Sequence, residues 1–231
     1  TVLSDLLQSV FKLPSKRVFN FVMQIAKGLN YAHRHGIVHQ DIKPANIMVL
    51  PNDRIKILDF GLACPVGSEN FLTGTPFYMS PEQVQCFPVD QRSDIYSLGL
   101  VVYEMLTGRK PFEGNDHWKV MEMRTDRDIP DPAELIPDMP GPLRDFIRKA
   151  CARDPDKRFR NIAEVLASMK SLAAEYGLAN GGPYEPKRKI RMFYLVYGDE
   201  DTKELKVAVD DFYIKMQRIG VDLKAGDLID L

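Results

Sequence analysis

The sequence has few of the features that mark specialised protein classes. Its three cysteines are widely spaced and form no CxxC pair, which favours small buried side chains in a reducing compartment over a disulfide framework. The longest apolar run, Leu98 to Leu106, contains Gly99 and Glu104 and is too short to cross a bilayer. The formal net charge of -1 argues against general electrostatic binding to nucleic acid or anionic lipid. What remains is an ordinary globular composition, and 231 residues suffice for one large domain or two smaller ones.

Hydrophobic periodicity predicts the elements of the first part of the chain. Residues 16–35 carry an apolar stripe at helical spacing, with Ser15 as the expected N-cap and Gly36 as a left-handed stop. Two β-branched runs, 46–50 and 54–58, flank the turn sequence PND and predict a β-hairpin.

Further helices are expected downstream. Residues 93–108 are apolar nearly all round and predict a buried helix, capped by Ser93 or Asp94 and ended by Gly108. Helical patterns also occur around Trp118 and in the segments PLRDFIRKACAR and NIAEVLASMKSLAAEYG.

The composition and the pattern of the sequence change after residue 176. Residues 177–189 are rich in glycine, proline and basic residues and are predicted to be a linker. Residues 190–231 show a strand, helix, strand order, which predicts a small α/β (βαβ) extension. Acidic and basic residues are equally frequent after residue 186, so the cluster KRKIR is not read as a nucleic-acid signal.

Polar groups are unusually dense in HQDIKPAN, residues 39–46. Asp41, Lys43 and Asn46 lie there on a turn between predicted strands, and Asp59 follows the hairpin in the sequence LDFG. Two carboxylates, a lysine and an amide on adjacent loops suit phosphoryl transfer. That reaction needs a carboxylate to orient a hydroxyl, a cation to neutralise phosphate, and oxygen ligands for Mg²⁺.

These motifs and their order resemble the eukaryotic-type serine/threonine protein kinases, in particular the bacterial ones. The resemblance covers about residues 1–176 and implies the mainly α C-terminal lobe of a kinase, with short β-hairpins. The motifs that carry it, in chain order, are HQDIKPAN, DFG, GTPFYMSPE, SDIYSLG and KRF.

The resemblance implies roles in phosphate transfer to serine or threonine hydroxyls of protein substrates. Asp41 matches the catalytic base that accepts or orients the hydroxyl proton, and Lys43 matches the lysine that contacts phosphate in serine/threonine kinases. Thr75 matches the threonine that contacts both. Residues 75–78 match the segment that shapes the pocket for the residue after the phosphoacceptor.

The resemblance also implies ATP and Mg²⁺ as cofactors. Asn46 and Asp59 match the two Mg²⁺ ligands. Ala45, through its carbonyl, and Met48, through its side chain, match the residues that line the ribose and adenine side of the nucleotide.

Other matching residues are expected to be structural. Glu82 and Arg158 match a buried ion pair that anchors the activation segment. Asp94 is expected to hold the backbone of the 39–46 loop, and His39 to stack on Phe60.

The sequence also departs from the family. Gln40 stands where an arginine usually binds a phosphate on the activation loop, so activity is not expected to depend on phosphorylation of that loop. The sequence contains no G-x-G-x-x-G motif after a strand and no V-A-I-K-like run, and it opens without methionine. The N-terminal lobe is therefore expected to be absent, which would make the chain a fragment.

Consequences of a missing lobe are also expected. Met48 and Leu58 would be exposed, which predicts self-association through that face, and ATP·Mg²⁺ would bind weakly. The alternatives are a non-catalytic, pseudokinase-like binding or scaffold module, and a function carried by the tail as a signalling or dimerisation unit. With no membrane span in view, a cytoplasmic location is expected.

Overall fold

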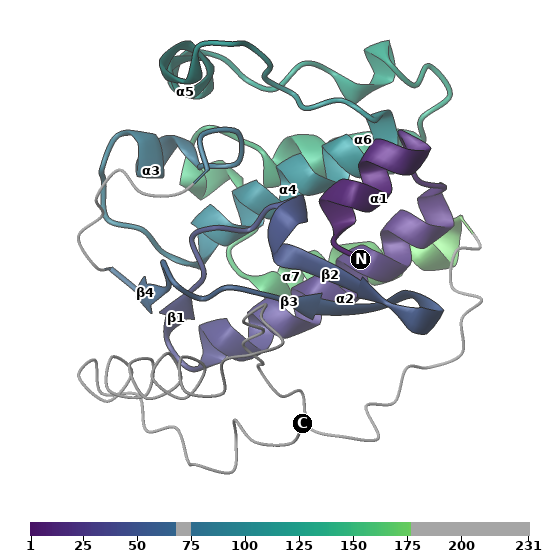
Figure 1. Ribbon diagram of the computed structural model, residues 1–231, viewed down its shortest axis with the longest axis horizontal. Coiled ribbons are helices and arrows are strands. Elements are labelled where there is room, and N and C mark those ends of the chain that lie inside the picture. Colours follow the sequence, from purple (N-terminus) through teal and green to yellow (C-terminus); the bar gives the residue numbers. More distant parts are fainter. Residues whose placement is uncertain (68–74, 177–231) are drawn as a thin grey trace, which may run out of the picture. The chain divides into compact units, whose positions relative to one another are not determined.

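The computed structural model describes residues 1–67 and 75–176, which form a mainly helical unit with two small antiparallel sheets (Figure 1). The helices are α1 (Leu3–Val10), α2 (Ser15–Arg34), α3 (Pro81–Val84), α4 (Gln91–Thr107), α5 (His117–Asp126), α6 (Gly141–Ala150) and α7 (Ile162–Glu175). The strands are β1 (Ile37–Val38), β2 (Ile47–Leu50), β3 (Arg54–Ile57) and β4 (Cys64–Pro65). Short 3₁₀ turns are η1 (Pro44–Asn46), η2 (Pro51–Asp53), η3 (Pro132–Glu134) and η4 (Pro155–Lys157). The predicted mainly α fold class is confirmed for this unit, and the predicted linker 177–189 and extension 190–231 lie outside the described residues.

Helix α2 buries the stripe that predicts it and packs against α4, α7 and β3 (Figure 1). Gly36 follows it with φ +73°, which confirms the left-handed stop. The predicted N-cap is wrong. The helix includes Ser15, and Pro14 occupies the N-cap position without a side-chain capping bond. Because the φ angle of proline is fixed near the helical value, a helix can begin at the residue that follows Pro14.

Helix α4 is buried over most of its surface, as its apolar composition predicts, and Gly108 ends it with φ +73°. The predicted cap at Ser93 or Asp94 is wrong. Asp90 caps the helix by accepting a hydrogen bond of 2.7 Å from the Arg92 N–H. The apolar pattern misplaces the start because the first turn of the helix is polar. Ser93 and Asp94 are therefore inside the helix, and their side chains are free to bind other segments.

Helices α4 and α6 approach closely in the middle of the unit (Figure 1). A Cβ atom on Gly99 of α4 would lie 2.5 Å from Cys151 Sγ, at the end of α6. Glycine is therefore required at this crossing, since a side chain would force the helices apart.

The two sheets bring the polar segments together. Strands β2 and β3 form the predicted hairpin, with Ile47 opposite Ile57, and Asn52 and Asp53 provide the two left-handed residues of its turn. Strands β1 and β4 pair antiparallel, with Val38 opposite Cys64. Residues 39–46 and the segment after β3 are thereby held beside each other.

The first residues of the chain pair with β2. Val49 donates its backbone N–H to the Thr1 carbonyl at 2.8 Å, and Val2 forms a β-bridge with Met48. Met48 is only 8% exposed and Leu58 is half-buried. The expectation that Met48 is exposed is wrong, because residues 1 and 2 pair with its strand. Self-association stays a prediction, but exposure of Met48 no longer supports it.

Candidate active site

Asp94, in the first turn of α4, holds the backbone of the polar loop, residues 39–46. Its carboxylate accepts hydrogen bonds from the N–H groups of His39 and Gln40, both at 2.8 Å, and contacts His33 Nε2 at 2.7 Å. Burial alone would raise the pKa of Asp94, but the hydrogen bond and charge of His33 hold that pKa below its ordinary value. Asp94 thus remains a carboxylate and fixes the loop, which is the role predicted for it.

Asp41, Lys43 and Thr75 form a connected group. Lys43 Nζ donates to Asp41 Oδ2 and to Thr75 Oγ1, both at 2.6 Å. Asn46 Nδ2 donates to the same Asp41 oxygen and to the Asp41 carbonyl, both at 2.9 Å. The other carboxylate oxygen, Oδ1, receives one longer bond, 3.3 Å, from the Thr75 N–H. Three residues thus donate to one carboxylate, and Thr75 among them comes from a segment that is distant in sequence, as the motif order predicts.

Asp59 lies beside this group, at the end of the β2–β3 hairpin. The backbone N–H of Leu58 donates to the Asn46 carbonyl at 2.8 Å, which ties the two segments together. Asp59 is exposed, has φ +58°, and accepts a bond of 2.9 Å from the Gly61 N–H through Oδ1. A Cβ atom on Gly61 would lie 2.8 Å from this oxygen, so glycine leaves room for the carboxylate.

His39 links the polar loop to the segment after β3. Its ring centroid lies 4.4 Å from that of Phe60, and Nε2 is 3.1 Å from the Leu58 carbonyl oxygen. The predicted contact between the two rings is therefore present, although the ring planes are tilted by 57° and not stacked in parallel. Burial lowers the pKa of His39, so its ring is neutral near pH 7 and acts as a structural bridge.

The remaining predicted nucleotide contacts differ in exposure. Ala45 is exposed, whereas the Met48 side chain is almost covered. An open groove of about 480 Å³ runs past Lys43, Ala45 and Thr75 and continues between α1 and the end of α4. A solute in this groove would contact Lys43 and Thr75, whereas Asp41 is buried and does not line it.

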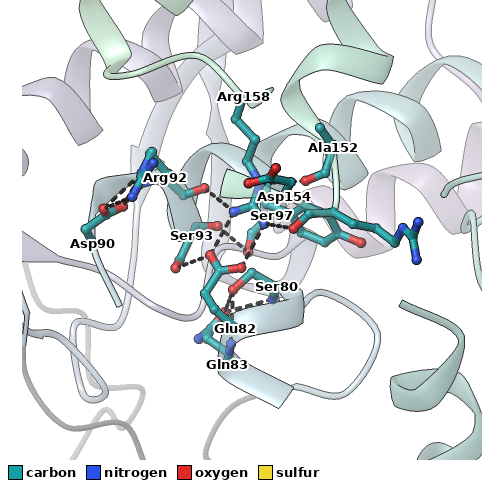
Figure 2. A network of polar contacts seen from close by, with 12 residues as sticks. Ser80, Glu82, Gln83, Asp90, Arg92, Ser93, Ser97, Ala152, Asp154 and Arg158 are labelled. Carbon is teal, nitrogen blue, oxygen red and sulfur yellow. Dashed lines mark hydrogen bonds and ion pairs between the residues drawn. The ribbon is translucent and has the colours of Figure 1, made fainter. Parts of the chain in front are cut away.

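The predicted ion pair between Glu82 and Arg158 is present and bidentate, with both N–O distances at 2.7 Å (Figure 2). Ser93 Oγ also donates to Glu82 at 2.6 Å. Arg158 donates in addition to the carbonyls of Ala152, Arg92 and Arg153. Both charges are buried with their hydrogen-bonding capacity largely used, which is the condition for a stabilising buried pair.

Some contacts near the site were not predicted from the sequence. Ser80 caps α3 and forms a reciprocal capping box with Gln83, a pattern that the spacing S-x-x-Q could have indicated. Gln83 also donates to the Gln40 carbonyl at 2.8 Å. Arg124 of α5 reaches the carbonyl of Pro76, and its sequence context gives no signal of this.

Comparisons with known proteins identify the family. The chain belongs to the protein kinase domain family, whose model matches residues 1–169. This confirms the resemblance found in the motifs.

The chain's relatives include bacterial serine/threonine-protein kinases. It is 38% identical over 180 residues to a probable serine/threonine-protein kinase of Clostridium acetobutylicum, covering 75% of this chain and 27% of the relative. It is 37% identical over 174 residues to the serine/threonine-protein kinase PknB of Mycolicibacterium smegmatis, covering 72% of this chain and 28% of the relative. It is also 35% identical over 181 residues to the serine/threonine-protein kinase PknL of Mycobacterium tuberculosis, covering 76% of this chain and 45% of the relative. The chain thus spans less than half the length of these relatives.

Two negative findings apply to residues 1–67 and 75–176. No helix there combines the length and the apolar character that a membrane crossing needs. No group of three or more His, Cys, Asp or Glu side chains is placed there to hold a metal ion unaided. A metal at Asn46 and Asp59 would therefore need further ligands from elsewhere.

Proposed function

We propose that this chain carries the phosphate-transfer residues of an ATP- and Mg²⁺-dependent serine/threonine protein kinase. The observation that supports this most directly is the contact of Lys43 Nζ with both Asp41 and Thr75 at 2.6 Å beside an open groove. The names of the relatives support the choice of serine and threonine.

In this proposal Asp41 orients the substrate hydroxyl and receives its proton. Lys43 and Asn46 occupy Oδ2, whereas Oδ1 receives only the longer bond from the Thr75 N–H, so Oδ1 is the oxygen that meets the hydroxyl. Lys43 brings a positive charge to the place where the phosphoryl group is transferred, and so offsets its negative charge.

Asn46 and Asp59 fit a magnesium site. With Nδ2 directed at Asp41, the side-chain oxygen of Asn46 is left as a hard ligand, and Asp59 adds an exposed carboxylate on an adjoining segment. Mg²⁺ is commonly held by one or two side chains together with substrate phosphates and water, so two protein ligands suffice. Bound ATP·Mg²⁺ supplies the phosphoryl group and neutralises its charge. Ala45 and Met48 are proposed to line the nucleotide, Ala45 through its carbonyl.

The test is a phosphotransfer assay on the native gene product, with ATP, Mg²⁺ and peptides that differ only in having Ser, Thr or Tyr as acceptor. Transfer to Ser and Thr but not to Tyr is expected, and chelation of divalent cations should stop it. If no peptide is phosphorylated, the proposal fails, and the non-catalytic binding module becomes the better hypothesis.

Gln40 leads to a second expectation. Its uncharged side chain donates to Cys64 Sγ, so it provides a neutral contact where an arginine would provide a charge for a phosphate. Treating the native gene product with a phosphatase before the assay should leave the transfer rate unchanged. Gln40→Arg, treated in parallel, serves as a comparison. A clear fall in the rate of the wild-type protein after treatment would contradict this expectation.

A further inference from the structure

Arg124 of α5 is buried without a carboxylate partner among the described residues. Its side chain is fully covered, and neither Nε nor Nη2 has a hydrogen-bond partner there. The guanidinium lies 5.7 Å from the centre of the Phe112 ring. Burial lowers the pKa of Arg124 to about 10, which still leaves it charged at neutral pH. An unpaired buried charge opposes folding, so its presence calls for a reason other than packing.

The one hydrogen bond that Arg124 makes among these residues is to the substrate-facing segment. Nη1 donates to the carbonyl oxygen of Pro76. Residues 75–78 form a β-turn, closed by a bond of 2.9 Å from the Tyr78 N–H to the Thr75 carbonyl, with Pro76 in its second position. The bond that closes a β-turn leaves the carbonyl of the second residue unused, so this group needs another donor. Arg124 supplies that donor.

Other side chains hold the neighbours of Pro76. Thr75 is bound by Lys43, as described above. Lys110 Nζ lies 4.4 Å over the centre of the Phe77 ring. The Tyr78 hydroxyl donates to Glu104 at 2.5 Å, and Ser97 donates to the Tyr78 carbonyl at 2.7 Å. Pro76, by contrast, depends on Arg124.

We propose that Arg124 is a positioning residue for protein substrates, which acts by fixing the Pro76 carbonyl and, with it, the 75–78 turn. The inference rests on the proposed kinase function, in which this turn shapes the pocket for the residue after the phosphoacceptor. Arg124 makes no hydrogen bond to Asp41, Lys43, Asn46 or Asp59, so loss of Arg124 should affect peptide recognition rather than the use of ATP.

The experiment compares Arg124→Met and Arg124→Lys with the wild-type native gene product, using peptides that vary at the residue after the acceptor. Arg127→Met is the matched control, because it makes the same change on an exposed side chain just past α5. Arg124→Met should raise the peptide KM by about tenfold, the effect of losing a hydrogen bond to a charged group. The kcat and the KM for ATP should not change, and the preference among the peptides should flatten. Arg124→Lys retains the charge and should give intermediate values, and Arg127→Met should behave as wild type.

The inference is overturned if Arg124→Met lowers the melting temperature but leaves the peptide KM and the peptide preference at wild-type values. Arg124 would then be a core residue only. Should Arg124→Met fail to fold, Arg124→Lys decides: an intermediate KM supports the inference, and a wild-type KM overturns it.

Failure of the kinase proposal itself gives a different result. In that case the wild-type protein transfers no phosphate. Amide hydrogen exchange then tests whether Arg124 anchors the 75–78 turn. Faster exchange of the Tyr78 N–H in Arg124→Met, with α2 unchanged, would support the anchoring of the turn. Equal exchange rates would refute it.

Discussion

Asp41→Asn is expected to lower the kcat of phosphate transfer by about 10²- to 10⁴-fold, the usual contribution of a general base. Asparagine keeps the shape of the side chain and can still accept the bonds from Lys43 and Asn46. It removes the negative charge that pairs with Lys43 at 2.6 Å and the oxygen that would take the hydroxyl proton. The KM for ATP should change little, because the proposed nucleotide contacts come from other residues.

The measurement is steady-state phosphotransfer by the native gene product, with thermal unfolding as a check on folding. Asp138→Asn is the matched control, since Asp138 is exposed and lies outside the polar loop. Transfer by Asp41→Asn at the wild-type rate would remove Asp41 from the proposed chemistry. Loss of activity together with a large drop in melting temperature would instead indicate a structural role.

Arg158→Met is expected to destabilise the fold by about 3–5 kcal/mol, because it leaves the Glu82 carboxylate buried without its partner. The Glu82→Leu, Arg158→Met double variant should regain much of this loss, since it removes both buried charges together. Arg153→Met is the control, because the Arg153–Asp128 pair is exposed and should contribute about 0–1 kcal/mol. Denaturant unfolding followed by circular dichroism measures all of these variants.

The same pair predicts how stability depends on pH. Burial alone would raise the pKa of Glu82, but the hydrogen bonds and charge of Arg158 outweigh burial and hold it below its ordinary value of 4.5. A carboxylate with a lowered pKa stabilises the fold above its unfolded-state pKa, and this contribution disappears as the pH falls through the folded-state value. The wild-type protein should therefore lose stability below pH 4.5 more steeply than the double variant. Identical slopes would show that Glu82 does not titrate with unfolding.

The sequence predicts the contacts of the candidate active site well. Asp41, Lys43 and Thr75 meet as the motif order implies. Glu82 and Arg158 also pair as expected. The kinase family is confirmed by the comparisons, whereas the individual roles of the site residues and the cytoplasmic location stay predictions.

Element boundaries and tertiary contacts were less predictable. Apolar periodicity places the start of α4 too late, because the polar first turn carries no periodic signal. The burial of Met48 depends on pairing with Val2, which is distant in sequence. Arg124 shows no pattern at all, because its partner is a backbone carbonyl, which every residue carries.

The distance along the chain between Glu82 and Arg158 also has a consequence for synthesis. Arg158 follows Glu82 by 76 residues. At typical rates of translation the ribosome needs about 4–15 s to add that length. Throughout this interval the growing chain already contains the residues of the polar loop and of the 75–78 turn, while Arg158, the partner of Glu82 in the folded unit, has not yet been made. The Glu82–Arg158 ion pair can therefore form only after α6 has been made, so this anchor of the segment that carries Glu82 is added late in synthesis.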